Sequence, residues 1–263
     1  MSIEVGPGQL WASGQAYEGY IGRWSRLVAS ELLTWLGVPP GGRWLDVGSG
    51  TGALSATILA VAEPASVTGV DPSEAFVAHA RAATPAAEFV VGDAGALPFP
   101  DRAFDAVVSG LVLNFVTEPE RAVEEMARVA APGATVAAYV WDYAGEMQLM
   151  RQFWDVAVEL DPAARKLDEG QRFSLQLDAL WRDAGLVSVE PRAIDVPTVF
   201  AGFDDYWLPF LGGQGPAGAY AASLDQPRRE VLRERLRGRL PVEADGSIRL
   251  VARALAVRGV ATG

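Results

Sequence analysis

A glycine-rich stretch, WLDVGSGTGA at residues 44–53, is the part of this sequence most suited to hold a ligand. Gly48, Gly50 and Gly52 alternate with small residues, and Asp46 stands two residues before the first glycine. Glycines in such a loop let the backbone approach a ligand closely. That ligand can be the pyrophosphate of a dinucleotide, the phosphates of a nucleotide or a molecule without phosphate. A Walker loop is excluded, because no Lys–Ser/Thr pair follows the glycines.

Two further aspartates end the next two predicted strands. Asp71 follows SVTGV, and Asp93 follows EFVVG. Asp71 stands at about the distance from the glycines at which an acidic residue bonds ribose hydroxyls in dinucleotide sites. The loop, taken by itself, therefore also fits the loose dinucleotide pattern of Gly48, Gly50 and Ala53.

Alternating strands and helices must position these residues. We expect strands at 43–47, 66–71, 88–93, 104–110 and 134–142, and helices at 53–62, 73–83 and 118–131. Pro, Gly, Ser or Thr marks most of the helix ends. This alternation predicts right-handed βαβ units and a parallel sheet. In such a sheet the ligand lies beyond the carboxyl ends of the strands, where the strand order reverses.

The segments before residue 40 and after residue 142 do not continue the alternation of strands and helices. Residues 15–37 have helical apolar spacing before a Pro-Pro pair. Beyond residue 142 we expect helices near 145–160 and 173–184, a link at 161–171 between them, and strands at 186–199 and 248–260. We interpret 143–172 and 201–240 as additions that lie over the mouth of the sheet. The sequence thus predicts a single domain over 1–263 with its cofactor-binding core at 40–142.

The composition excludes several kinds of reactive site and of binding partner. The 263 residues include no cysteine and one histidine, His79, so disulfides, iron–sulfur clusters and a cysteine nucleophile are excluded and no metal site is expected. The net charge of −11 speaks against a general electrostatic grip on nucleic acid. No apolar run approaches the ~20 residues that cross a bilayer, and the N-terminus lacks the pattern of a signal peptide. We expect a cytoplasmic protein; the sequence does not give its oligomeric state.

Three motifs together resemble one family. VGDAGALPFPDRAFDAVVSG at 91–110, with LDVGSGTG and VTGVDPS before it, resembles the class I S-adenosylmethionine-dependent methyltransferases. The likeness is greatest to the branch that includes ubiquinone/menaquinone-type methyltransferases, and it is specific over about 40–142. It implies an α/β, Rossmann-like fold with a seven-stranded, mostly parallel sheet, an antiparallel last strand and helical lid insertions.

The resemblance also implies residue roles. Asp46 and the loop backbone face the methionine part of the cofactor, Asp71 takes the ribose hydroxyls, and Asp93 accepts from the adenine amino group. Tyr17 closes the site and Arg23 pairs with the cofactor carboxylate, although this helix can equally be one that only packs on the sheet. The implied cofactor-binding residues are Tyr17, Arg23, Asp46, Gly48, Ser49, Gly50, Asp71, Pro72, Gly92, Asp93, Ala94, Ser109 and Leu111.

Elementary electrostatics agrees with this ligand. S-adenosylmethionine carries a positive sulfonium and ammonium and no phosphate. Three aspartates at successive strand ends would therefore attract it, whereas they would repel a pyrophosphate.

Methyl transfer is a direct displacement, so the protein must mainly align the reactants and exclude water. We expect no obligatory acid or base, and we expect His79, two turns into its helix, to be structural. Asp142 and Tyr143 at the end of the fifth strand are the candidate catalytic residues. Asp142 can accept a proton from the acceptor, or it can merely cap the next helix. Asn114 stands where relatives often have histidine, which speaks against histidine-assisted deprotonation.

Two later stretches leave alternatives open. An aromatic cluster beside a Gly-rich hinge fits either an apolar lid pocket, suited to an aromatic or prenyl-like substrate, or a satellite core. Its members are Phe200, Phe203, Tyr206, Trp207 and Phe210. The segment 228–239 carries six arginines, which fit either an acidic partner or a solvated face with internal ion pairs.

The leading hypothesis is a methyltransferase acting on a small-molecule substrate, without nucleic acid or membrane as a partner. The alternatives are a cofactor-binding protein that does not methylate, such as a cyclase or an assembly subunit, and an NAD(P)-dependent oxidoreductase.

Overall fold

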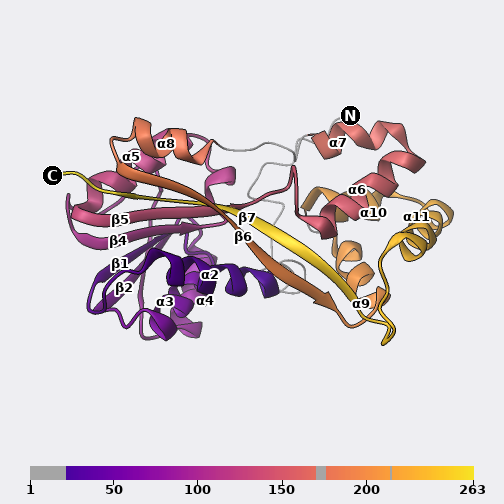
Figure 1. The fold of residues 1–263 in the computed structure, drawn as a ribbon, viewed down its shortest axis with the longest axis horizontal. Helices are drawn as coiled ribbons and strands as arrows, with labels where there is room; N and C mark the ends of the chain where they lie inside the picture. Colours follow the sequence, from indigo (N-terminus) through magenta and orange to yellow (C-terminus); the bar gives the residue numbers. More distant parts are fainter. Residues whose placement is uncertain (1–21, 170–175, 214) are drawn as a thin grey trace. The chain divides into compact units, whose positions relative to one another are not determined.

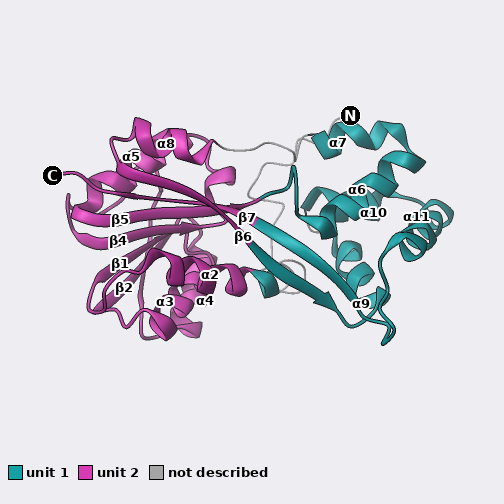
Figure 2. Cartoon of the chain, in the orientation of Figure 1, with its two compact units in different colours: residues 1–24, 142–174, 195–253 teal, residues 25–141, 175–194, 254–263 magenta. Residues whose placement is uncertain are grey.

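The computed structural model describes residues 22–169, 176–213 and 215–263 (Figure 1). The chain forms two compact units (Figure 2). Unit 2 holds 25–141, 175–194 and 254–263, and unit 1 holds 1–24, 142–174 and 195–253. The predicted core at 40–142 thus lies in unit 2 except for Asp142, and both predicted insertions lie in unit 1. A single domain, with the insertions over the mouth of the sheet, stays a prediction.

A seven-stranded sheet has the order β3-β2-β1-β4-β5-β7-β6. Its strands are β1 (Arg43–Val47), β2 (Ser66–Asp71), β3 (Glu88–Val91), β4 (Phe104–Gly110), β5 (Ala130–Trp141), β6 (Val187–Phe200) and β7 (Ile248–Val260). Neighbours from β3 to β5 are parallel, and β7 is antiparallel to β5. The predicted Rossmann-like fold with an antiparallel last strand is confirmed. The strand order reverses between β1 and β4, and a ligand site is expected after these two strands.

Helices cover both faces of the sheet in unit 2 (Figure 1). On one face lie α5 (Pro119–Val129) and α8 (Leu177–Asp183), and on the other lie α2 (Arg23–Leu36), α3 (Ala53–Val61) and α4 (Glu74–Ala83). This is why β4 is apolar along nearly its whole length, with Val107 and Val108 fully buried. Ser73 caps α4 by accepting the Phe76 N–H, so the helix predicted at 73–83 begins at Glu74 and Pro72 stands before the cap.

Several boundaries differ from the prediction. β3 ends at Val91, two residues before Asp93, and the chain then leaves the sheet as a loop. The helix predicted at 118–131 ends at Val129, because Ala130 already pairs with Phe104 before a register shift in β5. The helix predicted at 145–160 begins at Gln148, after a turn that starts at Asp142.

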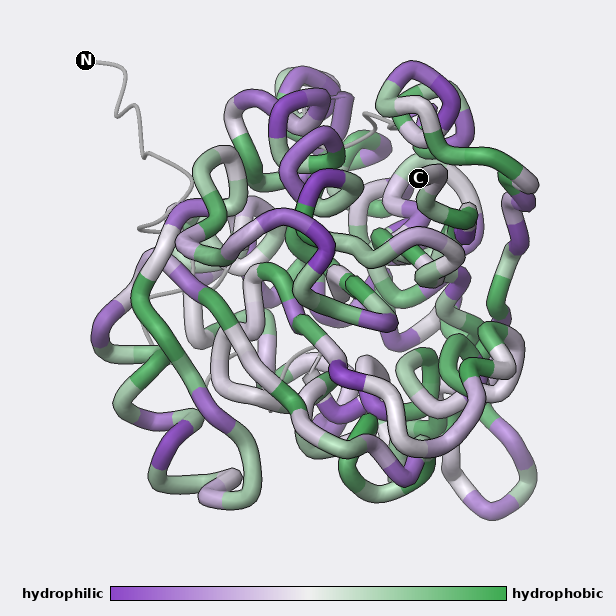
Figure 3. The backbone as a smooth tube through the Cα atoms, turned by 90° about the vertical axis from the view of Figure 1, so that its left-hand side faces the viewer, coloured by the Kyte–Doolittle hydropathy of each residue, from purple (hydrophilic) through white to green (hydrophobic). Residues whose placement is uncertain are grey.

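Unit 1 is mainly helical outside the ends of β6 and β7. Its helices are α6 (Gln148–Leu160), η4 (Pro162–Ala164), α7 (Arg165–Glu169), α9 (Phe203–Trp207), η5 (Leu208–Gly212), α10 (Gly215–Ser223) and α11 (Gln226–Arg239). Apolar and polar residues alternate along the chain in the manner of helices with one buried side (Figure 3). Leu232 and Leu236 of α11 and its C-cap Leu240 stand four positions apart and are buried, so this side of the helix packs inward. Among the described residues no helix has the length and apolar character needed to span a bilayer.

Candidate functional site

The glycine loop follows β1 and is shaped by three left-handed glycines. Gly48, Gly50 and Gly52 have φ of +73°, +52° and +88°. A Cβ on Gly48 would lie 2.5 Å from the side chain of Val112, which places the loop against the segment that follows β4. A Cβ on Gly50 would meet nothing within 4 Å. The loop is therefore closely packed at its base and open at its tip, where a ligand can approach.

The N–H groups of this loop have partners inside the protein. Gly48 and Ser49 both donate to the carbonyl of Val70, at 2.8 and 3.0 Å. Gly50 donates to the Asp71 carboxylate at 2.9 Å, and Gly52 donates to the Ser49 carbonyl at 2.8 Å. A phosphate-binding loop instead points its N–H groups at the ligand. The geometry therefore favours a ligand without phosphate. The Ser49 hydroxyl is buried and has no hydrogen-bond partner in the part of the chain that the structure describes.

Asp46 lies behind the loop rather than at its surface. Its side chain is buried, and its carboxylate accepts the Ser55 hydroxyl at 2.7 Å. Burial raises the pKa of Asp46 from the usual 3.8 to about 7; the Ser55 hydrogen bond opposes this rise, and the charge of Asp71 adds to it. The sequence located Asp46 beside the loop but gave no sign that it is enclosed.

Asp71 ends β2 and joins the loop to the next helix. One carboxylate oxygen accepts the Gly50 N–H and the other accepts the Ser73 N–H, both at 2.9 Å. Burial raises its pKa, and these two backbone hydrogen bonds oppose the rise. Each oxygen keeps a lone pair for a further donor such as a ribose hydroxyl. Pro72 lies exposed between Asp71 and Ser73.

The loop after β3 carries the predicted adenine contacts. Asp93 is exposed, and its Oδ1 accepts the Gly95 N–H at 2.7 Å, which tightens the turn around the half-buried Ala94. Gly92 donates to the Asp71 carbonyl at 3.1 Å, so the ends of β2 and β3 are tied together. Sequence reasoning missed Arg121, Glu125 and Arg128 on α5, whose side chains hold this loop. Their only sequence sign is a spacing that puts them on one side of the helix.

Two predicted cofactor-binding residues, Ser109 and Leu111, lie at the end of β4 and differ in their contacts. The Ser109 hydroxyl is fully buried and donates to the Val47 carbonyl at 2.9 Å, so it joins β4 to β1 inside the sheet. Leu111 has φ of +62°, and its N–H donates to the Tyr139 carbonyl at 2.8 Å. A non-glycine residue held in this region is strained, and such strain is common at functional sites. The oxygen of the Asn114 amide is buried without a partner.

Unit 1 contains the two predicted catalytic residues. Asp142 accepts the N–H groups of Gly145 and Glu146, at 2.9 and 3.1 Å, and thereby stabilises the turn that precedes α6. The predicted alternative that Asp142 caps the next helix is wrong, because the N-cap of α6 is Met147; Asp142 is instead bonded within the preceding turn. Tyr143 is half-buried next to it.

Arg23 and Trp24 begin α2 and belong to unit 1. The Arg23 guanidinium lies over the rings of Trp24 and Phe200, at 4.5 and 4.9 Å from their centroids, and its Nη1 donates to Asp205 at 2.9 Å. Its Nε and Nη2 are buried and have no hydrogen-bond partner among residues 22–169, 176–213 and 215–263. These two N–H groups form the edge that binds a carboxylate bidentately. Tyr17 lies outside the described residues.

The aromatic residues of 200–210 form the core of unit 1. All five predicted members, Phe200, Phe203, Tyr206, Trp207 and Phe210, are buried. Phe210 stacks on Phe153 of α6 with 4.5 Å between ring centroids, and the Tyr206 hydroxyl donates to the Leu149 carbonyl at 2.9 Å. The satellite-core alternative is therefore the one that the structure supports.

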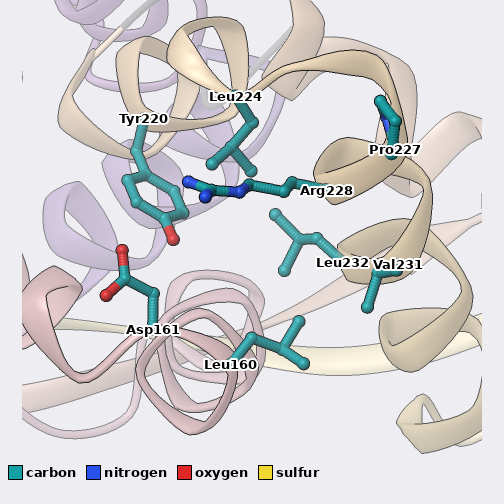
Figure 4. A pocket seen from close by; sticks show the side chains of 8 residues that line it. All are labelled: Leu160, Asp161, Tyr220, Leu224, Pro227, Arg228, Val231 and Leu232. Atoms are coloured by element: carbon teal, nitrogen blue, oxygen red, sulfur yellow. The ribbon is translucent and has the colours of Figure 1, made fainter.

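A pocket of about 440 Å³ lies elsewhere in unit 1, between the end of α6, α10 and α11 (Figure 4). One end is polar: the Tyr220 hydroxyl points toward the Asp161 carboxylate, and the Arg228 side chain extends toward Tyr220. Burial and the Asp161 charge raise the pKa of Tyr220. The rest of the wall is apolar and consists of Leu160, Leu224, Pro227, Val231 and Leu232. The pocket suits a molecule with an apolar body and one polar group.

The remaining charged residues have structural roles. Five of the six α11 arginines have partners within unit 1; for example, Arg233 bonds Glu230 at 3.0 Å and Arg239 bonds Asp155 at 3.3 Å. The predicted solvated face with internal ion pairs is confirmed. His79 lies exposed on α4.

The sheet order, the antiparallel β7 and the acidic strand ends around a glycine loop define a class I S-adenosylmethionine-dependent methyltransferase, a class whose cofactor is S-adenosylmethionine. Residues 45–138 match the family described as "Methyltransferase domain". Residues 45–138 thus form a methyltransferase domain, and the family resemblance stated from the sequence is confirmed for this part of the chain.

Two curated proteins and one solved structure illustrate the similarity. The demethylmenaquinone methyltransferase of Renibacterium salmoninarum is 39% identical over 120 residues, which cover 44% of this chain and 46% of that protein. The 2-methyl-6-phytyl-1,4-hydroquinone methyltransferase of Synechocystis sp. is 36% identical over 192 residues, or 68% of this chain and 57% of that protein. The chain thus spans about half the length of these relatives. The YcgJ protein of Bacillus subtilis shares the fold, with a TM-score of 0.59 at 18% identity over 90% of this chain and 99% of that one.

Proposed function

We propose that this protein transfers the methyl group of S-adenosylmethionine to a small-molecule acceptor by direct displacement. One observation carries the proposal: the glycine loop uses four of its N–H groups inside the protein and is bordered by the Asp71 carboxylate, with Asp46 buried behind it. That arrangement suits a cationic nucleoside and not a pyrophosphate. The alternative of an NAD(P)-dependent oxidoreductase loses support for the same reason.

The residues of unit 2 fit this cofactor. The open α-carbon face of Gly50 lets the methionine part approach, and the free lone pairs of Asp71 can accept the ribose hydroxyls. Asp93 and the Ala94 N–H would hold the adenine. The pairing of Arg23 of unit 1 with the cofactor carboxylate stays a prediction from the family resemblance.

Proximity and exclusion of water would carry the catalysis. When bound, the cofactor supplies an electrophilic methyl group on a sulfonium. The residues of this chain orient it, and no strong base is needed, since a sulfonium is a good leaving group. The Asp142 carboxylate already accepts two backbone N–H groups in the turn before α6. Asp142 and Tyr143 stay the candidate catalytic residues, and methyl transfer does not require either of them to remove a proton.

We infer an acceptor with an apolar body. The names of two relatives specify demethylmenaquinone and a phytyl hydroquinone, whose prenyl-type chains are apolar. The charge of −11 does not suit nucleic acid as a partner. A cytoplasmic location and the absence of a membrane partner stay predictions.

Calorimetric titration of the full chain with S-adenosylhomocysteine and with NADH tests the cofactor. We expect binding of the first and none of the second; NADH binding alone would overturn the proposal. Release of S-adenosylhomocysteine with a set of alkylated hydroquinones then tests turnover. Cofactor binding without release from any hydroquinone or phenol would favour the non-methylating alternative.

A further inference from the structure

The loop 93–101 joins the predicted adenine-binding residues to β4, and β3 beside it ends at Val91. The backbone of this loop is held by side chains of α5. Arg121 donates from Nε to the Gly95 carbonyl at 2.7 Å. The Leu97 N–H donates to Glu125 at 2.8 Å, and Arg128 donates to the carbonyls of Leu97 and Phe99, at 3.1 and 2.9 Å. Backbone groups of three alternate residues are thus bonded, much as a neighbouring strand would bond them.

The three helix residues act as one group. They are four and three positions apart, so their side chains leave the same side of α5. Glu125 and Arg128 also bond each other twice, at 2.7 and 2.8 Å, and Arg128 bonds Asp101 at 2.7 Å. The Arg128 guanidinium holds the pKa of Glu125 below its usual range, and Glu125 in turn raises the pKa of Arg128. Both groups therefore stay charged at neutral pH.

These side chains bond the loop from behind and not Asp93 itself. Asp93 bonds only inside the loop, to the Gly95 N–H through its side chain and to the Ala96 N–H through its carbonyl. The carbonyl of that same Gly95 is held by Arg121. The position of the Asp93 carboxylate is thus set by a short chain of bonds that ends on α5.

We propose that Arg121, Glu125 and Arg128 are positioning residues for the adenine end of the cofactor site, because they fix the loop that presents Asp93 and Ala94. This inference rests on the proposed function, and it assigns the three residues to recognition of the adenine amino group rather than to methyl transfer.

Two ligands separate this role from a general structural one. S-adenosylhomocysteine has the adenine amino group, whereas S-inosylhomocysteine has an oxygen there, which Asp93 would repel. We expect the wild-type protein to prefer the first by at least about tenfold, which corresponds to ~1.4 kcal/mol. In Arg128→Ala this preference should fall to within about twofold.

Two further variants test how much each helix residue contributes to the preference for S-adenosylhomocysteine. Arg121→Ala removes only the bond to Gly95, and its side chain is exposed, so this variant tests the role even if Arg128→Ala does not fold. Glu125→Gln keeps an acceptor for the Leu97 N–H but loses the charge that holds Arg128, and it should lower the preference less than Arg128→Ala. Arg182→Ala is the matched control, since it also removes a helix ion pair of unit 2, with Asp178, away from the loop.

The outcomes are distinct. An equal loss of affinity for both ligands in Arg128→Ala and Arg121→Ala, with the preference kept, would show a structural role only and overturn the inference. A wild-type protein that binds neither ligand would overturn the proposed function itself.

Discussion

Units 1 and 2 differ in the contacts at their centres, although carboxylates are bonded by backbone N–H groups in both, as Asp142 is in unit 1. In unit 2, backbone N–H groups fix carboxylates in place, as they do for Asp71, and helix side chains in turn fix a backbone loop. In unit 1 the Arg23 guanidinium is held between ring faces, and the unit is centred on stacked aromatic side chains. Hydrogen bonds to the backbone set the positions of single charged atoms, whereas aromatic packing sets shape and stability. The first suits an invariant cofactor, and the second suits an acceptor that differs between enzymes.

If the comparison is right, the largest loss of stability comes from the aromatic core of unit 1. Phe153→Ala should lower the free energy of unfolding by roughly 3–5 kcal/mol, because it removes a fully buried ring stacked on Phe210. Urea denaturation measures the change. Leu208, which is 58% exposed, is the control, and Leu208→Ala should change stability by less than ~0.5 kcal/mol. Similar losses in both variants would contradict the assignment of this core.

The next largest effect is a change of stability with pH, caused by the buried carboxyl of Asp46 in unit 2. The pKa of Asp46 in the folded protein, about 7, lies above the usual 3.8, so between these pH values the folded protein keeps a proton that the unfolded chain releases. The free energy of unfolding that Asp46 contributes at low pH is therefore lost as the pH rises from about 4 toward 7.

Asp46→Asn cannot ionise and should escape this loss. Above pH 7 we expect it to be more stable than the wild type by on the order of 2–4 kcal/mol, with little difference near pH 4. Thermal unfolding at pH 4, 6 and 8 measures this. A stability difference that does not change with pH would mean that Asp46 is ionised throughout.

A smaller effect concerns ligand affinity. Asp71→Ala should weaken binding of S-adenosylhomocysteine by roughly 1–3 kcal/mol, because charge-assisted bonds to the ribose hydroxyls are lost. Calorimetric titration measures it. Asp105→Ala is the control, since Asp105 pairs with Arg43 at the opposite, amino-terminal end of the parallel strands. Unchanged affinity in Asp71→Ala would show that the ribose site lies elsewhere.

The smallest effect is expected on the surface of unit 1. Arg237 bonds Glu234 at 3.3 Å and lies 4.2 Å from the Phe203 ring centroid, and its side chain is 43% exposed. Arg237→Gln should cost less than ~1 kcal/mol of stability in urea denaturation, since exposed pairs of this kind contribute little. A larger loss would mean that the arginine face of α11 supports the aromatic core.

Most strands and the glycine loop of unit 2 could be predicted from the sequence, because they depend on residues close together in the chain. Apolar runs bounded by Gly, Pro and Asp gave β1, β2, β4 and β7 their observed bounds. The order of three motifs predicted the loop and its aspartates. The enclosure of Asp46 and the inward hydroxyl of Ser109 could not be read, since both depend on which residues pack above a strand end.

The rest depends on contacts between distant residues. Glu125 and Leu97 are 28 positions apart, and no periodicity records that one bonds the backbone of the other. In unit 1 the sequence predicted the aromatic cluster but left open whether it forms a lid pocket or a core. Burial of Tyr206 and Phe210 against α6 decides for a core, while the pocket is lined by residues of three helices, α6, α10 and α11, that are distant in the sequence.

The chain passes from one unit to the other five times, and two of these passages lie inside β6 and β7. Strand pairing depends on the main chain and tolerates exchange of side chains. Recombination that replaced 142–174 and 195–253 would therefore give a new unit 1 while the glycine loop and its aspartates were inherited intact. Lineages of such enzymes can in this way diversify what they modify without having to rebuild the means of binding their methyl donor.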